Sequence, residues 1–191
     1  EIDACLVGSE MCIRDRKGWG DVVLVERKEL TSGSTWHAAG LLPLFNMSYS
    51  VGQIHKYSVK FYQELQEETG MDVGFRNVSN IRLASNQDRM DEFRQYAGVA
   101  STIGVQVDFL TPEQVLDYWP MANIDGLVGA IRHPQDGYIQ PADLTQALAR
   151  GARDRGAEIY RNTAVAAITR SDDGLWIVST DKGDITCEHV V

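Results

Sequence analysis

The stretch DVVLVE, Asp21 to Glu26, constrains the fold more than any other part of the chain. Four consecutive apolar residues end in an acid, a pattern that predicts a buried strand with the acid at its carboxyl end. In dinucleotide-binding α/β folds, an acid at the end of the second parallel strand binds a ribose hydroxyl, about 20 residues after a glycine-rich turn. Glu26 is therefore a candidate ribose ligand. The alternative is a surface strand that ends in glutamate for no functional reason.

The glycine-rich turn that should precede this strand is missing. The upstream sequence EIDACLVGSEMCIRDRKGWG contains no GxGxxG, so no pyrophosphate-binding turn at a helix N-terminus can be assigned. The run from Leu6 to Asp15 is identical to one translated frame of a standard transposon-type sequencing adapter. We therefore expect residues 1–16 to be non-native sequence, with the adapter covering residues 5–16, and exclude them from fold assignment. The alternative is a genuine N-terminal arm.

Composition argues against several classes of function. The net charge is −9 and no basic stripe with interleaved aromatic residues is present, so we expect no nucleic-acid partner. No apolar run approaches the ~20 residues of a membrane span, so we expect no membrane partner. The three cysteines and four scattered histidines form no disulfide framework and no metal-ligand spacing. We expect a soluble intracellular domain without a metal ion.

Hydrophobic periodicity and turn signals predict the main elements. The helix at about 50–69 has an apolar stripe of Val51, Ile54, Tyr57, Ser58, Phe61, Tyr62 and Leu65. Further helices are expected at about 87–103, ended by Gly104, and at 142–155, ended by Gly156, and a short one opens with Thr111 as N-cap and Pro112 at N1. Strands are expected at 21–26, within 75–84 and 127–134, and as four short strands after 156; QDGYIQP is predicted as a turn.

The segment TSGSTWHAAG (residues 31–40) is the most specific candidate for ligand binding. Gly33, Ser34 and Thr35 can bring backbone N–H groups and hydroxyls to a pyrophosphate. Small residues from Ala38 to Gly40 allow a flat ligand to approach the backbone closely. His37 lies among them beside Trp36. From the residues alone, a structural histidine is the commoner explanation.

The sequence VERKELTSGSTWHAAGLLPLF resembles the flavin-attachment segment of the dimethylglycine dehydrogenase and sarcosine dehydrogenase family, within the wider group of flavin-dependent amine and D-amino-acid oxidases. The resemblance continues through KYSVKFYQELQEETGMDVGF, NIRLASNQDRMDEF, LDYWPMANIDGLVGAIRHPQDGYIQP and LTQALARGARDRGAEI. It covers residues 17–191. It implies an α/β fold with a Rossmann-like FAD-binding domain, here without its first βα unit, and part of an α+β substrate domain.

The resemblance also implies the residues that bind FAD. His37 matches the histidine bonded to the flavin 8α-methyl carbon, a reaction that needs a neutral imidazole as nucleophile. Glu26 and Arg27 match adenosine-ribose contacts, and Val165 matches a backbone contact to adenine. The loop along the pyrophosphate and ring corresponds to Gly33, Ser34, Thr35, Trp36, His37, Ala38, Ala39, Gly40 and Leu41.

The family's catalytic residues match positions beyond Val191, so we nominate none here. Tyr138, His133 and Asp136 are candidates, but a turn explains QDGYIQP better. We expect residues 17–71 and 136–191 to form the FAD-binding domain and residues 72–135 part of the substrate-binding domain. The strand after Asp181 stops at its most apolar point, so we expect an internal fragment.

The function implied is oxidation of an N-methylated glycine-type amine by hydride transfer to FAD, with electrons passed to an electron-transfer flavoprotein. Tetrahydrofolate would bind in a C-terminal half not included here. The implied location is the bacterial cytoplasm, or the mitochondrial matrix in a eukaryote. Three alternatives stay open: a flavin-free binding or regulatory domain on the same fold, a non-functional fragment, and an amine or amino-acid oxidase that uses oxygen directly.

Overall fold

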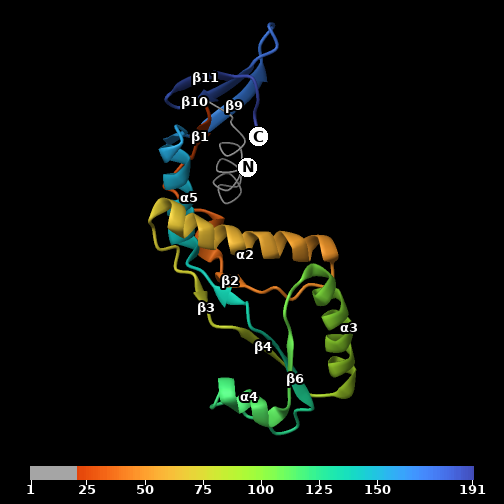
Figure 1. Cartoon of the computed structure of the whole chain (residues 1–191). Helices are drawn as coiled ribbons and strands as arrows, with labels where there is room; N and C mark the ends of the chain where they lie inside the picture. The colour runs from red at the N-terminus through yellow and green to blue at the C-terminus, as the bar shows by residue number, and fades with distance from the viewer. Residues whose placement is uncertain (1–20) are drawn as a thin grey trace. The chain divides into compact units, whose positions relative to one another are not determined.

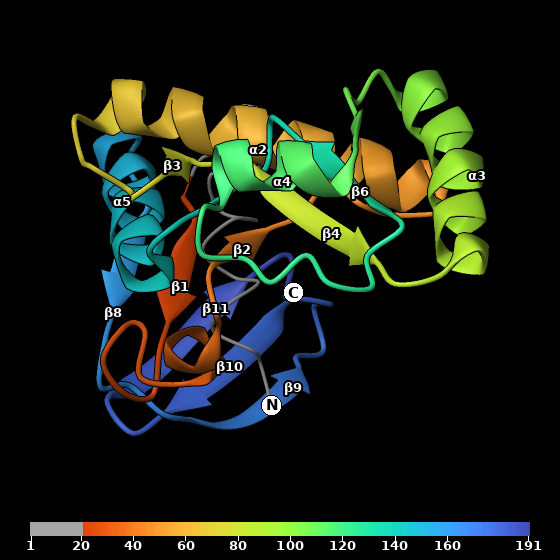
Figure 2. The same cartoon turned by 90° about the horizontal axis from the view of Figure 1, so that it is seen from below.

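The computed structural model describes residues 21–191 (Figures 1 and 2). The expectation that residues 1–16 are non-native falls outside the described residues and stays a prediction. Contacts divide the chain into two compact units. Of the described residues, the first holds 21–39 together with Glu68–Met71 and Pro141–Val191, and the second holds Gly40–Glu67 and Asp72–Gln140. The division by function into flavin and substrate domains also stays a prediction, because packing does not show what each part binds.

The first unit combines a parallel strand pair with an antiparallel sheet. Its elements are β1 (Val23–Val25), η1 (Ser34–His37), α5 (Pro141–Asp154), β8 (Glu158–Tyr160), β9 (Val165–Arg170), β10 (Trp176–Thr180) and β11 (Gly183–Cys187). β1 and β8 pair in parallel, and β10 is the central strand between β9 and β11 (Figure 1). α5 leads into β8 and packs against both β8 and η1. A helix that leads into a parallel strand is typical of α/β folds.

The second unit contains two antiparallel sheets of three strands. Its elements are β2 (Leu41–Leu42), most of α2 (Tyr49–Thr69), β3 (Arg76–Asn77), β4 (Asn80–Ala84), α3 (Gln87–Ile103), β5 (Asp108–Leu110), α4 (Pro112–Tyr118), β6 (Gly129–His133) and β7 (Gly137–Tyr138). The strand orders are β2-β7-β3 and β4-β6-β5. β7 and β6 are therefore the central strands, and they are consecutive in the sequence.

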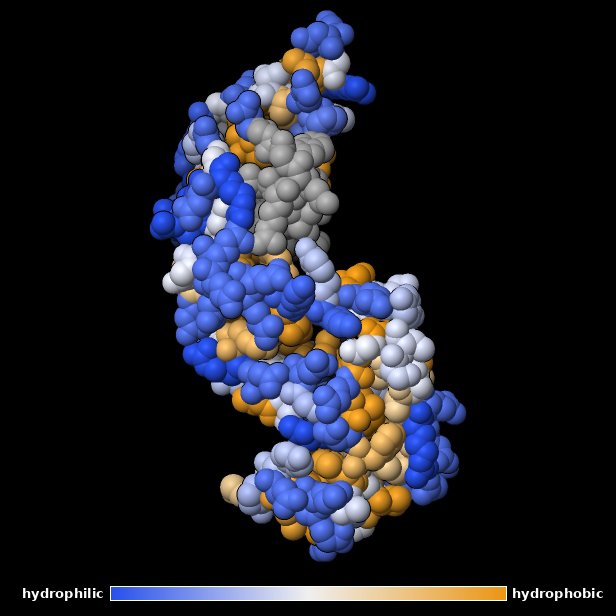
Figure 3. Space-filling model, in the orientation of Figure 1, coloured by the Kyte–Doolittle hydropathy of each residue, from blue (hydrophilic) through white to orange (hydrophobic). Residues whose placement is uncertain are grey.

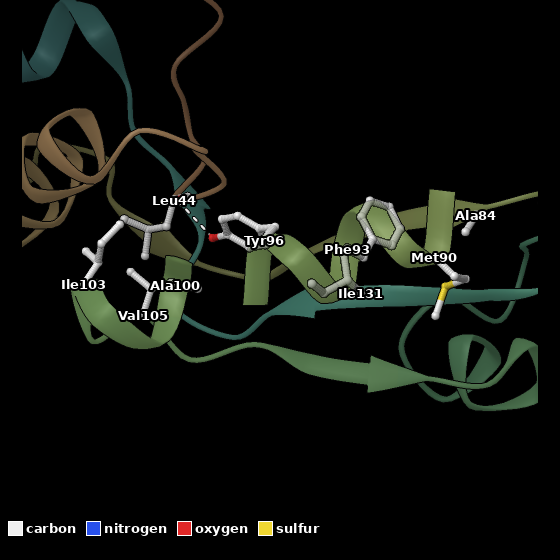
Figure 4. Packing of buried hydrophobic residues seen from close by; sticks show 9 residues of the cluster. All are labelled: Leu44, Ala84, Met90, Phe93, Tyr96, Ala100, Ile103, Val105 and Ile131. Carbon is white, nitrogen blue, oxygen red and sulfur yellow. Dashed lines mark hydrogen bonds between the residues drawn. The ribbon is translucent and has the colours of Figure 1, made fainter. Parts of the chain in front are cut away.

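The sheet β4-β6-β5 is covered on both faces. Successive side chains of a strand point to opposite faces, so neighbouring residues of β6 enter different clusters. Ile131 packs with Phe93 and Tyr96 of α3 (Figure 4), whereas Ala130 packs with Leu110 and with Val115 of α4. α3 and α4 are seen on either side of β4 in Figure 2. Leu44 belongs to the same cluster of buried residues as Ile131, so the packing of α3 on the sheet also fixes Leu44.

The helix boundaries predicted at Gly104, Thr111 and Pro112 are confirmed, and the structure adds an N-cap at Asn86. Asn86 caps α3 by accepting a 2.8 Å hydrogen bond from the N–H of Arg89, and the helix ends at Gly104 with φ of 75°. Thr111 caps α4 in a capping box with Gln114, and Pro112 opens the helix. Each cap satisfies N–H or C=O groups that the helix itself leaves unpaired.

The apolar stripe predicted on α2 is wrong over its first half. Phe61 and Leu65 are buried, but Ile54 and Tyr57 are 62% and 57% exposed. The face that meets α3 runs instead through Gly52, where an added Cβ would lie 2.4 Å from Ile103 Cδ1, and through Lys56, whose Nζ donates to the Ile103 carbonyl at 2.9 Å. Because Gly52 allows α2 to approach α3 closely, the buried face of α2 includes Gly52 and leaves Ile54 and Tyr57 exposed. Figure 3 shows hydrophobic residues at the surface among hydrophilic ones.

The prediction that QDGYIQP is a turn is also only partly right. Gly137 and Tyr138 form β7, which pairs with β2 on one side and β3 on the other. Two residues are too few to show the alternation that identifies a strand from sequence. The close packing is visible at Gly137, where an added Cβ would lie 2.2 Å from the carbonyl oxygen of Arg76. Only glycine fits between the three strands.

We therefore expect Gly137→Ala to lower the free energy of unfolding by about 1–3 kcal/mol, the usual cost of overpacking against atoms that cannot move aside. Gly98→Ala is the matched control, because this exposed glycine lies inside α3 and an added Cβ meets nothing within 4 Å. Alanine there should raise helix stability by up to about 1 kcal/mol. Urea denaturation of both variants checks the prediction, and equal effects would contradict it.

Candidate functional site

The ends of β1 and β8 bring two predicted contact residues to one edge of the first unit. The N–H of Glu26 donates to the Tyr160 carbonyl at 2.8 Å, and the N–H of Thr163 donates to the Glu26 carbonyl at 2.8 Å. Val165 follows two residues later and starts β9. Parallel strands open their ligand crevice at their carboxyl ends. Glu26 and Val165 therefore lie where the predicted adenosine half of the ligand would bind.

The carboxylate of Glu26 is fixed by its own backbone. Oε1 accepts a 2.8 Å hydrogen bond from the N–H of Lys28, so the strand ends in a tight turn with the acid at its edge. Glu26 is half-buried and Arg27 is exposed. A carboxylate in this position can accept hydrogen bonds from a diol.

Three residues that the sequence analysis missed lock this edge. Glu29 accepts hydrogen bonds from Asn162 Nδ2 at 2.7 Å and from an Arg161 guanidinium nitrogen at 2.6 Å. These bonds, with Asn162 first, hold the pKa of Glu29 below its ordinary value. Asn162 has φ of 52°, a left-handed conformation in which asparagine is enriched. An Asn just after a predicted strand was the available signal.

The loop Gly33 to Ala39 is anchored at one residue and open elsewhere. Thr35 is 3% exposed, and the short helix η1 packs against α5. Its neighbours Trp36 and His37 point outward: Trp36 is 70% exposed, His37 is exposed, and their ring centroids lie 4.5 Å apart. An added Cβ at Gly33 would meet nothing within 4 Å. The loop thus offers an accessible imidazole beside a large aromatic surface.

The last two predicted contacts, Gly40 and Leu41, lie in the second unit. Gly40 has φ of 73°, and its carbonyl accepts a 2.8 Å hydrogen bond from the N–H of Ile139. Leu41 pairs with Tyr138 and is 68% exposed. Backbone pairing to β7 therefore holds these two residues while the Leu41 side chain faces outward.

A buried polar cluster lies next to this pairing. His133 and Asp136 are 0% and 1% exposed. Asp136 Oδ1 accepts a 2.9 Å hydrogen bond from the N–H of Leu44. Within the described residues, Asp136 Oδ2 and both ring nitrogens of His133 are buried without a hydrogen-bond partner. Both residues were candidates in the sequence, where a turn explained them better.

Burial shifts the titration of this cluster. It raises the pKa of Asp136 to about 6, against the opposing effects of the Leu44 N–H and the Arg82 guanidinium. It lowers the pKa of His133 to about 4, and the positive charge of Arg82 adds to that shift. Burial also raises the pKa of Tyr96 to about 12. His133 is therefore a neutral imidazole at neutral pH.

Two further observations concern other ligands and membranes. Within residues 21–191, no three His, Cys, Asp or Glu side chains are grouped so that they could hold a metal ion. No helix in this part of the chain combines the length and the apolar character needed to cross a membrane.

Comparison with known proteins gives the family. Residues 12–191 match the family described as FAD dependent oxidoreductase. The chain belongs to this family. The chain is 38% identical to rat mitochondrial dimethylglycine dehydrogenase over 92% of its own length and 20% of that protein. It therefore spans about a fifth of this curated relative.

Two other relatives bear on function. The chain is 35% identical to the formaldehyde-forming 4-methylaminobutanoate oxidase of Paenarthrobacter nicotinovorans, over 91% of the chain and 21% of that oxidase. It is 34% identical to the mouse mitochondrial pyruvate dehydrogenase phosphatase regulatory subunit, over 92% of the chain and 20% of the subunit.

Solved structures confirm the fold class of this flavoprotein family member. L-proline dehydrogenase from P. horikoshii superposes with a TM-score of 0.85 at 23% identity, over 94% of the chain and 47% of that enzyme. Glycine oxidase from Bacillus cereus superposes with a TM-score of 0.79 at 28% identity, over 96% of the chain and 50% of that oxidase. The predicted α/β, Rossmann-like class and the resemblance to the dimethylglycine and sarcosine dehydrogenases are confirmed. The contact residues from Glu26 to Val165 stay a prediction.

The pKa of His133 predicts how stability depends on pH. The folded state disfavours protonation of this imidazole, whereas the unfolded chain protonates it near pH 6.5. Stability contributed by neutral His133 is therefore present above pH 6.5 and is lost as the pH falls toward 4. We expect wild type to lose about 2 kcal/mol relative to His133→Asn between pH 7.5 and pH 5.

Denaturation curves of wild type and His133→Asn between pH 7.5 and pH 5 measure the difference in their free energies of unfolding. The other titrating groups, Asp136 included, are present in both proteins, so their contributions largely cancel in this difference. A pH-independent difference between wild type and His133→Asn would contradict the assigned burial of the imidazole.

Proposed function

We propose that this chain is the FAD-binding part of an oxidoreductase that oxidises an N-methylated glycine-type amine, such as dimethylglycine or sarcosine, with FAD attached covalently to His37. The observation that carries the proposal is the exposed His37 of S-T-W-H, held on a loop anchored by Thr35, in a chain 38% identical to a dimethylglycine dehydrogenase.

The residues present fit FAD. Glu26 supplies a carboxylate at the carboxyl end of a parallel strand pair, where adenosine ribose binds in such folds. Gly33 leaves open space above its backbone, as close approach of a pyrophosphate requires. Arg27, Ser34 and the stretch from Trp36 to Leu41 complete the proposed contacts, with Val165 at the adenine.

The role of the protein in this proposal is to bind and orient. FAD, when bound, supplies the acceptor for a hydride from the substrate carbon next to nitrogen. Packing of η1 on α5 fixes the backbone from which His37 projects. The imidazole must be neutral to bond through nitrogen, and its exposed position leaves it hydrated and accessible. The contact of Trp36 with His37 restricts the ring that forms the bond.

We further propose that electrons pass to an electron-transfer flavoprotein and that tetrahydrofolate binds in a part of the protein outside these residues. Both follow from the resemblance to the dimethylglycine and sarcosine dehydrogenases. The mitochondrial rat relative supports a matrix location if the source is a eukaryote. A bacterial enzyme of this kind would be cytoplasmic.

His37→Ala tests the attachment. In protein expressed from its complete open reading frame, wild type should give a yellow precipitate in acid, because covalent flavin stays with the polypeptide. The variant should release its FAD into the supernatant. His55→Ala is the control, since this histidine lies on α2 and contacts the Pro43 carbonyl at 3.1 Å. Flavin that stays with the His37→Ala precipitate would sink the assignment.

A flavin-free regulatory domain is the second candidate, favoured by the likeness to a phosphatase regulatory subunit. Under this candidate, purified wild-type protein carries no flavin and binds no added FAD. The absorbance spectrum of the purified protein separates the two functions before any variant is made.

An oxygen-using oxidase is the alternative within enzymes, supported by the relatives named 4-methylaminobutanoate oxidase and glycine oxidase. Anaerobic reduction by sarcosine or dimethylglycine, followed by mixing with air, distinguishes the two. Slow reoxidation in air with fast reoxidation by an electron-transfer flavoprotein supports the dehydrogenase. Fast reoxidation in air supports the oxidase.

A further inference from the structure

We propose that Asp136 is a positioning residue for the bound flavin: it holds Leu44, where the backbone pairing of the segment Gly40–Leu44 to β7 has ended, and so supports the two residues of that segment proposed to face the flavin, Gly40 and Leu41. The proposal rests on the proposed function, because it requires flavin to contact Gly40 and Leu41.

Backbone pairing accounts for only the first part of this segment. The N–H of Ile139 donates to the Gly40 carbonyl at 2.8 Å, and Leu41 and Leu42 pair with Tyr138 and Gly137 in the β2–β7 ladder. The pairing ends there. Asp136, the next residue back along the chain from β7, reaches Leu44 with its side chain instead. The carboxylate thus extends the attachment by two residues beyond the last backbone pair.

Leu44 is held at both of its peptide groups. Asp136 Oδ1 accepts its N–H at 2.9 Å, and the Tyr96 hydroxyl donates to its carbonyl at 3.2 Å (Figure 4). Its side chain is 3% exposed. The next residue, Phe45, lies against the Tyr96 ring at a centroid distance of 4.2 Å. Leu44 and Phe45 are therefore fixed, and the Pro43 carbonyl, between them and the β2–β7 ladder, lies 3.1 Å from His55 Nδ1.

The chemistry of Asp136 is hard to explain as turn structure alone. A buried carboxylate with one oxygen lacking a hydrogen-bond partner destabilises a fold, and an asparagine would cap the same N–H without a buried charge. The charged or titratable groups near it are Arg82 from β4, Tyr96 from α3 and His133 from β6. Arg82 is stacked on Phe45, with its Cζ 4.2 Å from the ring centroid. The same cation thus supports the carboxylate and covers the fixed segment.

The test compares three variants of the flavin-loaded, full-length protein. Asp136→Leu removes the acceptor and keeps the same branched arrangement of side-chain heavy atoms. Asp136→Asn keeps an oxygen for the Leu44 N–H. Val115→Ala is the control, because Val115 is buried in the other core cluster of the same unit and its loss weakens packing without touching Leu44. The readouts are amide hydrogen exchange at Leu44 and the flavin absorption spectrum.

We expect Asp136→Leu to accelerate exchange at Leu44 about tenfold, the effect of one lost hydrogen bond, and to shift the flavin spectrum. Asp136→Asn should return both readouts toward wild type. Val115→Ala should leave the flavin spectrum unchanged. A flavin spectrum in Asp136→Leu identical to wild type overturns the positioning role, whatever happens to exchange. Wild-type protein without flavin overturns the proposed function instead, which the spectrum of the unmutated protein reveals first.

If Asp136→Leu does not fold, Tyr96→Phe gives the answer. It removes only the hydroxyl that donates to the Leu44 carbonyl and keeps the ring against Phe45. A shift of the flavin spectrum in Tyr96→Phe, with flavin still bound, supports the proposal that the attachment of Leu44 positions the flavin. An unchanged spectrum despite faster exchange at Leu44 overturns it.

Discussion

The parallel pairing of β1 with β8 is the constraint on which the candidate adenosine site depends. It joins Val23–Val25 to Glu158–Tyr160, so residues far apart in sequence end their strands at one edge. Hydrogen bonds then join the segments that follow the two strands: the N–H of Thr163 donates to the Glu26 carbonyl, and Asn162 Nδ2 donates to Glu29. Without this pairing, Glu26 would be an acid after an isolated strand. With it, the acid lies at the carboxyl edge where α/β folds bind nucleotides.

The two parts of the proposed flavin-binding segment are held by different interactions. Around His37 the loop is anchored by one buried threonine and by the packing of η1 on α5, which leaves the reactive side chains exposed. From Gly40 onward the chain is held by backbone pairing to β7 and by the buried carboxylate of Asp136. In the proposed function, the first part presents an accessible nucleophile on a packed turn, and the second part is held by backbone pairing beside the bound cofactor.

Local sequence signals predicted local structure well. Gly104 and Thr111 mark helix ends by their own backbone and side-chain chemistry, so no tertiary information was needed. The stripe on α2 failed because Gly52, a residue with no hydrophobic signal, allowed the closest approach to Ile103. β7 was missed because its strand character comes from its neighbours β2 and β3 and not from its own two residues.

The candidate site divides in the same way. His37, Glu26 and the small residues between were predicted from pattern and resemblance, since their chemistry is visible in the residue types. The Glu29–Asn162 bond and the burial of Asp136 depend on contacts between distant segments, and no local pattern records such contacts. Asp136 was named from the sequence and explained by a turn, but its burial could not be foreseen, because a turn aspartate and a buried one look alike in a single sequence.

The bond from Leu44 to Asp136 spans 92 residues of sequence, and that separation orders events in time. A ribosome adds about 5–20 residues per second. Gly40–Leu44 is therefore synthesised about 5–20 s before its partners Asp136–Ile139. During synthesis the segment that follows His37 therefore has no ladder to join. The pairing of this segment is completed late in synthesis, by a strand of two residues made long after His37.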